Sequence, residues 1–431
     1  MHLDVKYHCM KQFKFTDTIA GWVVFAIASL CYILTIEPTA SFWDCGEFIV
    51  TAFRQEVGHP PGAPLFMILG RFFSLFAFGD VTKVPVMINC MSALASGFTV
   101  LFLYWSITHI AKRIICGSES EVSMAKGIVI IGSGVVGALS FAFTDTFWFS
   151  AVEGEVYAMS SLFTAVVFWC ILKWEECADQ KYANRWLVLI AYLMGLSIGV
   201  HLLNLLAVPA IVFVYYFKKY KTDVAGVVKA FVISTLILAG ILYIIIPGVV
   251  WVASMFELMF INGLGAPYNT GTIIYAILGL GALVFGLYYT YKKAKPVLNT
   301  ILLCVTVIII GYSSFAMICI RSAADPPMDE NDPNNVFSLQ SYLNREQYGD
   351  RPLVSGEYFN SQLISYENGS PTYIQKTDAT KLLIIRQFVI LIRLPPQCSL
   401  VCIVPSRIIS TVINIGLISK TLILSLHLPR I

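Results

Sequence analysis

Apolar residues occur along this chain in long runs separated by short polar loops, which is the pattern of membrane-spanning helices. A helix needs about 20 predominantly apolar residues to cross a hydrocarbon core of about 30 Å. We therefore predict an all-α polytopic membrane protein, with a transmembrane domain over residues 1–320 that contains about nine spans. The predicted spans are 17–36, 84–110, 126–143, 156–173, 186–203, 204–217, 228–247, 272–291 and 297–320.

Two apolar stretches do not correspond to one simple span each. Residues 62–78 are interpreted as an amphipathic or re-entrant helix at the outer surface, because counting them as a span would invert every later loop. Residues 186–217 are too long for a single crossing and hold His201 and Asn204 near the middle, so we predict a tight outer turn there. The alternative is one tilted helix, which would break the alternation between loops rich in Lys and Arg and loops poor in them.

The distribution of lysine and arginine predicts the orientation, because short cytoplasmic loops are enriched in these residues. Basic residues cluster before the first predicted span and in alternate loops after it, whereas the opposite loops up to residue 320 carry only Arg54, Arg71 and Lys83. The pattern predicts a cytoplasmic N-terminus and a first extracytoplasmic loop over residues 37–83. The cytoplasmic set comprises Lys6, Lys11, Lys14, Lys112, Arg113, Lys126, Lys173, Lys181, Arg185, Lys218, Lys219, Lys221, Lys229, Lys292, Lys293 and Lys295.

Composition supports the same class of protein. Hydrophobic residues make up 57% of the chain and charged residues 13%, and the mean hydropathy is +0.75, which excludes an ordinary soluble domain. The net charge of +3 arises from the loop asymmetry and gives no indication of nucleic-acid binding. The eleven cysteines have no metal-ligand spacing. The first span lacks a cleavage site and is expected to remain as an anchor.

Two further segments follow the predicted bundle. Residues 321–378 begin with a polar, turn-rich stretch and are interpreted as the start of an extracytoplasmic soluble region. Residues 379–431 contain no Asp, Glu or Tyr and show no clean periodicity, so we interpret them as a non-native or frameshifted tail. The alternative for this tail is a further span near 408–428.

Asp44 and Glu47 lie just after the first predicted span. They are three residues apart, so on a helix they share one face. One carboxylate could act as a general base while the other orients it or holds a substrate hydroxyl. The aromatic neighbours Trp43 and Phe48 are expected to raise a carboxylate pKa by desolvation. The alternative is that both acids cap or solubilise a short helix.

His59 belongs to the segment Gly58-His59-Pro60-Pro61-Gly62, which the prolines make a rigid, non-helical turn. We interpret His59 as a turn residue rather than a catalyst, though one directed at the same site. Glu153 and Glu155 occur with Asp145 in a short aromatic loop predicted on the same outer side. These acids could bind sugar hydroxyls or a divalent metal, although their spacing is no recognised metal signature. A solvated loop is the alternative.

His201 and Asn204 are expected at the outer turn, and Arg321 ends the last predicted span at the same surface. A cation there could hold a lipid phosphate, whereas the alternative for Arg321 is a side chain that extends to the interface. The chain has no P-loop, no GxGxxG after a strand and no GxSxG motif, so nucleotide-driven chemistry is not expected.

Five motifs together resemble a bacterial family of membrane proteins whose animal relative is a transmembrane protein O-mannosyltransferase acting on receptor ectodomains. The resemblance extends over roughly residues 15–378. It is carried by Ser41-Phe42-Trp43-Asp44-Cys45-Gly46-Glu47-Phe48, Gly58-His59-Pro60-Pro61-Gly62-Ala63-Pro64-Leu65, Glu153-Gly154-Glu155-Val156-Tyr157, Gly195-Leu196-Ser197-Ile198-Gly199-Val200-His201-Leu202-Leu203-Asn204 and Tyr342-Leu343-Asn344-Arg345-Glu346-Gln347-Tyr348-Gly349.

The resemblance implies a GT-C-like glycosyltransferase bundle that moves a sugar, with mannose favoured, from a polyprenyl-phosphate donor to a hydroxyl acceptor with inversion. The acceptor would be a Ser or Thr of an exported protein or another glycan, and a divalent metal is left open. Asp44 matches the acidic base position of GT-C enzymes, with Glu47 as its partner. The residues expected to bind substrate are Trp43, His59, Glu153, Glu155, Tyr157, His201, Asn204 and Arg321.

The sequence is also compatible with two other classes of function. A transporter or lipid-linked sugar flippase would use the acids as proton or substrate sites, but such proteins carry ionisable groups near the midplane and show inverted repeats. A structural scaffold would explain the spans but not the clustered acids. The expected location is a bacterial inner membrane, or the endoplasmic reticulum membrane in a eukaryote.

Overall fold

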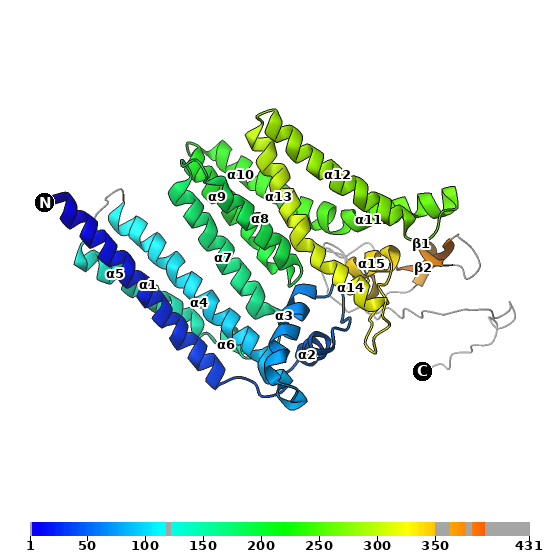
Figure 1. Ribbon diagram of the computed structural model, residues 1–431, viewed down its shortest axis with the longest axis horizontal. Helices are drawn as coiled ribbons and strands as arrows, with labels where there is room; N and C mark the ends of the chain where they lie inside the picture. The colour runs from blue at the N-terminus through cyan, green and yellow to red at the C-terminus, as the bar shows by residue number, and fades with distance from the viewer. Residues whose placement is uncertain (1, 118–121, 350–362, 376–381, 393–431) are drawn as a thin grey trace. The chain divides into compact units, whose positions relative to one another are not determined.

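The computed structural model describes residues 2–117, 122–349, 363–375 and 382–392, and within them the chain is almost entirely helical (Figure 1). The predicted all-α polytopic membrane fold is confirmed. The α-helices are α1 His2–Leu34, α2 Cys45–Arg54, α3 Pro64–Ser74, α4 Val84–Cys116, α5 Met124–Ala142, α6 Asp145–Ala151, α7 Val156–Cys177, α8 Asn184–Ile198, α9 Val208–Lys219, α10 Val224–Ala239, α11 Ile246–Leu258, α12 Thr270–Lys292, α13 Pro296–Tyr312, α14 Ala316–Ser322 and α15 Val336–Leu343.

Short helical turns extend or join several of these helices. They are the 3₁₀ segments η1 Leu75–Ala77, η2 Val81–Lys83, η3 Leu202–Ala207, η6 Ser313–Phe315 and η7 Glu346–Tyr348, and the π-helical segments η4 Gly240–Ile245 and η5 Met259–Gly263. Two strands, β1 Leu363–Gln375 and β2 Leu382–Ile392, pair in a two-stranded sheet.

The chain divides into two compact units. The first comprises residues 1–344 with 373–383, and the second comprises residues 345–372 with 384–431. We predicted the end of the transmembrane domain at residue 320, whereas the first compact unit continues through α14 and α15 to residue 344. Within this unit, Val57 pairs with Asp329 of the loop between α14 and α15. Of the predicted tail 379–431, only 382–392 lies within the described residues.

Eight helical segments of the described chain are long and apolar enough to cross a membrane: Gln12–Leu34, Val81–Cys116, Met124–Ala142, Val156–Cys177, Leu202–Lys219, Val224–Gly263, Thr270–Lys292 and Pro296–Ser322. The fifth predicted span, 186–203, is not among these eight segments. It corresponds to α8, a shorter apolar helix that ends at Ile198. The predicted turn follows it, since Gly199 ends α8 and His201 precedes η3.

Close backbone contact explains how the short helix α8 is held. A Cβ on Gly195 would lie 2.5 Å from the carbonyl oxygen of Ile308 in α13, and a Cβ on Gly311 would meet the backbone of Gly195 and Leu196. Small residues allow two helices to approach in this way and gain dispersion contacts that larger side chains prevent. Helix α8 is therefore packed tightly against α13.

The segment predicted as one span at 228–247 is longer in the structure. Its helix continues through the π-helical turn η4 into α11 and ends at η5. Helix α10 packs on α9, whereas α11 packs on α12 and α15. The apolar run alone did not indicate that the two halves of this long helix pack against different helices. π-Helical turns often mark such irregularities in an otherwise α-helical segment.

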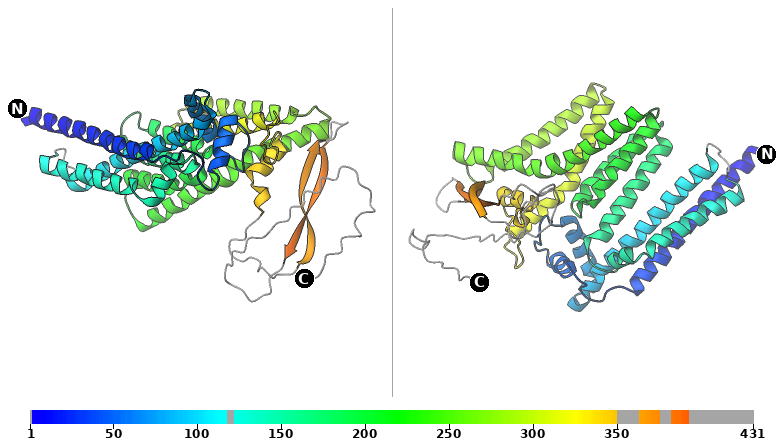
Figure 2. Two further views of the ribbon diagram at one scale, coloured as in Figure 1. Left: turned by 90° about the horizontal axis from the view of Figure 1, so that it is seen from below. Right: turned by 180° about the vertical axis from the view of Figure 1, so that it is seen from behind.

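The long helices pack as neighbours: α1 on α4 and α5, α4 on α7, α7 on α8, and α8 on α13 (Figures 1 and 2). One end of this bundle gathers the basic residues. Arg113 of α4 pairs there with Glu175 of α7, and Lys219 of α9 donates to the Ala178 carbonyl at 2.8 Å. The loops predicted as cytoplasmic therefore lie at a common end of the helices.

The other end holds the shorter helices α2, α3, α6, α14 and α15. The stretch 62–78 forms α3 and η1, too short to cross a bilayer, as we predicted. Phe66 and Met67 of α3 are fully buried in the largest apolar cluster, together with Ile49 of α2 and Ile318 of α14. This packing fixes the first loop against the ends of the long helices.

Candidate active site

Asp44 occupies the N-cap position of α2 and Glu47 lies in the first turn of that helix. The amphipathic α2 buries Phe48, Ile49 and Ala52. The Asp44 side chain makes no capping hydrogen bond, although capping is the usual role of aspartate at this position. Its side chain remains 57% exposed. The alternative of a purely capping role is therefore not realised for Asp44.

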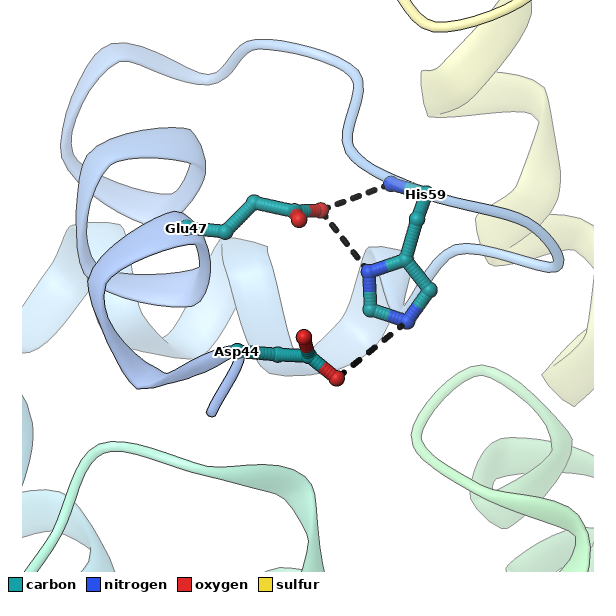
Figure 3. A group of neighbouring side chains, drawn as sticks. All are labelled: Asp44, Glu47 and His59. Atoms are coloured by element: carbon teal, nitrogen blue, oxygen red, sulfur yellow. Dashed lines mark hydrogen bonds and ion pairs between the residues drawn. The ribbon is translucent and has the colours of Figure 1, made fainter. Parts of the chain in front are cut away.

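His59 lies between the two carboxylates (Figure 3). Glu47 Oε1 accepts a hydrogen bond of 2.7 Å from the backbone N–H of His59 and is 2.9 Å from its Nδ1. On the other side of the ring, Nε2 is 4.0 Å from Asp44 Oδ2. Glu47 is thus the partner of His59, and His59 connects Glu47 to Asp44. Beyond the turn role that we predicted for it, His59 is a central member of the site.

The loop that carries His59 is fixed from three sides. Tyr342 of α15 donates a hydrogen bond of 2.6 Å to the Gly58 carbonyl. Gly62 has a φ of +71°, and a Cβ there would lie 2.7 Å from the Tyr342 hydroxyl, so only glycine fits. The Phe48 ring packs edge-on against His59 at 5.5 Å. These contacts determine where the imidazole points.

The interaction between Glu47 and His59 changes both pKa values. Burial alone would raise the pKa of Glu47, but the side-chain and backbone hydrogen bonds from His59 and its charge together lower it. The hydrogen bond to Glu47 raises the pKa of His59 against the effect of burial, with Glu47, Asp44 and Glu330 adding to the rise. The predicted rise in carboxylate pKa is therefore wrong for Glu47, because the sequence did not reveal its cationic partner.

Glu153 and Glu155 show the raised pKa values instead. Their residues are only 3% and 9% exposed. Burial raises the pKa of Glu155 to about 7, the charges of Glu153 and Asp44 add to this rise, and His59 opposes it. Burial also raises the pKa of Glu153, against a hydrogen bond with Ser41. The solvated-loop alternative does not apply to these two buried residues, and Glu155 interacts electrostatically with Asp44.

Asn89 of α4 joins the first and second loops, and sequence reasoning missed it. Its Nδ2 donates to the carbonyls of Glu37 at 2.6 Å and Thr39 at 3.0 Å. A Cβ on Gly154 would lie 2.8 Å from its Oδ1. The signal available in the sequence was a polar residue inside a predicted apolar span, and the structure shows that this residue is fully buried. Tyr342 was visible only as part of a motif and had no assigned role.

Tyr157 and His201 form a second pair, with ring centroids 5.4 Å apart. The His201 turn is joined to the start of α3 because the Leu65 N–H donates to the Gly199 carbonyl at 2.8 Å. Asn204 is fully buried and donates to Ser197 Oγ at 2.9 Å, so it stabilises the turn from within. Of the three, Tyr157 is well exposed, at 44%.

Arg321 lies apart from the trio. Arg321 donates to the carbonyls of Gln55 and Arg54, at the C-terminal end of α2. Because α2 has 10 residues, this end is roughly 15 Å from Asp44 at the other. Trp43 precedes Asp44 with a φ of +59° and is 87% exposed.

The trio also offers ligand atoms for a divalent cation. One atom each of Asp44, Glu47 and His59 lies within 4.8 Å of the others. Two carboxylates and one imidazole suit Mn²⁺ or Zn²⁺ better than Ca²⁺, which prefers oxygen ligands throughout. Glu47 Oε1 is already engaged by two N–H groups of His59, so a cation would use the other oxygen of Glu47.

Residues 44–224 match the family model of the "Protein O-mannosyl-transferase TMEM260 N-terminal domain". Over this segment, the chain is related to that family. Protein O-mannosyl-transferase tmem260 of Dictyostelium discoideum is 26% identical over 204 residues, 46% of this chain and 23% of that protein. TMEM260 of Mus musculus is 26% identical over 176 residues, 41% of this chain and 22% of its own length.

The chain thus spans about a quarter of the length of these relatives. The match includes the Asp44, Glu47 and His59 trio, Glu153, Glu155, Tyr157, His201 and Asn204, whereas Arg321 lies outside it. These similarities support the relation to transmembrane O-mannosyltransferases that the motifs predicted. No solved structure matches the chain.

Proposed function

We propose that this protein is a GT-C-type membrane glycosyltransferase that transfers a sugar, with mannose favoured, from a polyprenyl-phosphate donor to a Ser or Thr hydroxyl of an exported protein. The observation that carries the proposal is the arrangement of Asp44, Glu47 and His59. One carboxylate is accessible, and a histidine held by a second carboxylate lies beside it. The similarity to O-mannosyl-transferases over the segment that contains these residues supports it.

Asp44 is the general base in this proposal. Its exposed carboxylate takes the proton of the acceptor hydroxyl while the acceptor oxygen forms a bond to the anomeric carbon. The bond between that carbon and the phosphate oxygen breaks, and polyprenyl phosphate leaves with its electron pair. A single displacement of this kind inverts the anomeric centre. A base that is positioned in advance contributes typically 10² to 10⁴ in rate.

Glu47 and His59 orient the base. The raised pKa of His59 and the lowered pKa of Glu47 favour an imidazolium and carboxylate pair near neutral pH. The positive ring, 4.0 Å from Asp44, then restrains the carboxylate on the side opposite the acceptor. Glu47 is therefore a positioning residue that acts through His59.

The remaining residues of this region bind the two substrates. Glu153 and Glu155 accept hydrogen bonds from sugar hydroxyls, which carboxylates at a buried site favour. The aromatic rings of Trp43 and Tyr157 are exposed and offer stacking surfaces for sugar or peptide. We assign the donor phosphate to His201, beside Tyr157, rather than to the distant Arg321.

The site lies on the extracytoplasmic face in this proposal, because the opposite end of the bundle carries the basic loops. A bacterial inner membrane is favoured, and the endoplasmic reticulum would present the same topology. The donor lipid carries an already activated sugar phosphate, so no soluble nucleotide is required.

One observation favours a second candidate, a proton-coupled transporter or flippase. Glu155 is buried and its pKa is about 7, as expected of a carboxyl group that binds and releases protons near neutral pH. The two functions differ in their product. A transferase forms a glycosidic bond, whereas a transporter moves substrate without changing it.

The test uses membranes from cells that express the full chain, mixed with polyprenyl-phosphate mannose and a Ser/Thr-rich peptide. The proposal predicts a peptide mass increased by one hexose, absent with membranes lacking the protein. Movement of labelled lipid-linked sugar across reconstituted vesicles without any modified peptide would instead support the transporter.

A further inference from the structure

An open cleft lies at the C-terminal end of α2, away from the trio. Its volume is about 630 Å³. Arginines from three elements line it: Arg54 ends α2, Arg71 lies in α3 and Arg321 lies in α14. The rest of the lining is Phe53, Gln55, Glu56, Ala324, Asp325, Pro326 and Pro327.

Two of the guanidinium groups are held by backbone carbonyls. Arg71 donates to the Phe53 carbonyl at 2.8 Å and lies over the Phe53 ring at 5.3 Å. Arg321 donates through Nε to the Gln55 carbonyl at 2.5 Å and through Nη2 to that of Arg54 at 3.5 Å. These bonds satisfy carbonyls at the negative end of α2. They use only part of the five N–H donors of each arginine.

Arg54 has a different environment. Its side chain is 60% exposed, and the structure gives it one ion pair, with Glu56 at 3.8 Å. Helix capping accounts for Arg71 and Arg321, but it does not explain why a third arginine shares their cleft. Convergence of guanidinium groups from separate elements is the usual chemistry of phosphate recognition, because each group can donate two parallel hydrogen bonds.

The charges of the cleft nearly balance. Three arginines face two carboxylates, Glu56 and Asp325, so the lining carries one net positive charge. A phosphodiester carries one negative charge and would neutralise it. The candidate active site shows the opposite character, with the acids Asp44, Glu47, Glu153 and Glu155 around one histidine. The arginine cleft therefore attracts a further phosphate, distinct from the donor phosphate that we assign to His201.

The position of the cleft along the chain indicates the source of the phosphate. Arg321 lies in the last turn of the apolar segment Pro296–Ser322, and α3 lies shortly before the segment Val81–Cys116. Spans end at the level of lipid headgroups. Next to Arg71, α3 and η1 expose Phe72, Leu75 and Phe76, which an acyl chain could cover.

We propose that Arg54, Arg71 and Arg321 form a binding site for the phosphate of an anionic membrane phospholipid. The site holds α2 by its C-terminal end while Asp44 projects from the other end. The proposal does not depend on sugar transfer and holds for a transferase or a transporter alike.

The test measures thermal unfolding of the purified full chain in detergent during titration with a short-chain phosphatidylglycerol, and separately with inorganic phosphate. A ligand that binds the folded state raises the Tm. Arg54→Gln is the principal variant, because Arg54 caps nothing and its loss should leave α2 folded. Lys83→Gln is the matched control, since Lys83 is an exposed cation of the same loop that does not line the cleft.

We expect phosphatidylglycerol to raise the Tm of wild type and Lys83→Gln equally. In Arg54→Gln we expect about tenfold weaker binding, as for the loss of one charge-assisted hydrogen bond. Arg54→Lys should recover part of the affinity. An equal rise in Tm with inorganic phosphate would show that the site binds soluble phosphate rather than a phospholipid. Identical titrations of wild type and Arg54→Gln, or no response to either ligand, would overturn the proposal.

Discussion

Glu47 and His59 are joined twice: the same carboxylate oxygen accepts the backbone N–H at 2.7 Å and lies 2.9 Å from Nδ1 of the ring. The first contact fixes the chain and the second fixes the imidazole. The result is that Nε2 points toward Asp44, at 4.0 Å. The proposed mechanism depends on this double contact, so its disruption should be visible both in the titration of His59 and in activity.

Glu47→Gln should lower the pKa of His59 toward its ordinary value of 6.5, because the main cause of the rise is removed. NMR of labelled histidine in the solubilised protein measures this change, and Asp80→Asn in the same loop is the control. His59 has a raised pKa in the folded state, so its contribution to stability is full below about pH 6.5 and is lost as the pH rises through the folded value.

Glu47 has a lowered pKa, so its contribution is present above about pH 4.5 and is lost as the pH falls through the folded value. The Tm difference between wild type and Glu47→Gln should therefore be largest between about pH 4.5 and about pH 6.5. A difference that does not vary with pH would contradict the ion pair.

Glu155→Gln should stabilise the protein at alkaline pH. The pKa of Glu155 is about 7, above its ordinary 4.5, so wild type loses stability as the pH rises through this range and the buried carboxyl group ionises. The shift corresponds to about 3 kcal/mol at full ionisation. Chemical denaturation at pH 5 and pH 8 measures it. Equal stability changes at both pH values would show that Glu155 is not buried as described.

Tyr342→Phe removes the hydroxyl that donates to the Gly58 carbonyl at 2.6 Å. Leaving a buried carbonyl without its partner costs about 1 to 3 kcal/mol. We expect a modest fall in Tm and a larger fall in transfer, because the loop aims His59. Tyr243→Phe, at a 76% exposed tyrosine, is the control. Wild-type activity in Tyr342→Phe would show that transfer does not require this hydrogen bond.

Gly195→Val should destabilise the bundle by about 3 kcal/mol, since a side chain there meets the backbone of α13 and neither helix can yield locally. Gly279→Val is the matched control, because a Cβ at Gly279 of α12 meets nothing within 4 Å. Thermal unfolding of both variants in detergent is the measurement. Equal Tm values for the two would rule out the close contact of α8 with α13.

Hydrophobic pattern predicted most of the fold because each span is a local property of the sequence. The turn near His201 and the short helix after Gly62 were both predicted correctly, from the length of one apolar run and the charge alternation around another. The continuation of α10 into α11 was missed, since it depends on which helices pack against each half.

The site was predicted in part for the same reason. Asp44 and Glu47 are close because they share one helical turn, which spacing reveals. His59 joins them through a loop that Tyr342 holds from nearly three hundred residues away. No local pattern shows that contact, so the direction predicted for the pKa of Glu47 was wrong. The position of Arg321 was predicted only from the end of an apolar span. The carbonyls at the end of α2, to which Arg321 donates, could not be predicted in this way.

Mannose transfer by Asp44→Asn membranes tests the central claim most directly. The asparagine keeps the size of the side chain but cannot accept a proton. The control is Asp80→Asn, at an exposed acid that pairs with Lys83. With polyprenyl-phosphate mannose and a Ser/Thr-rich peptide, we expect product formation to fall by about 10² or more in Asp44→Asn. It should remain unchanged in Asp80→Asn. Transfer by Asp44→Asn at the wild-type rate, with equal amounts of folded protein, would contradict the assignment of Asp44 as the base.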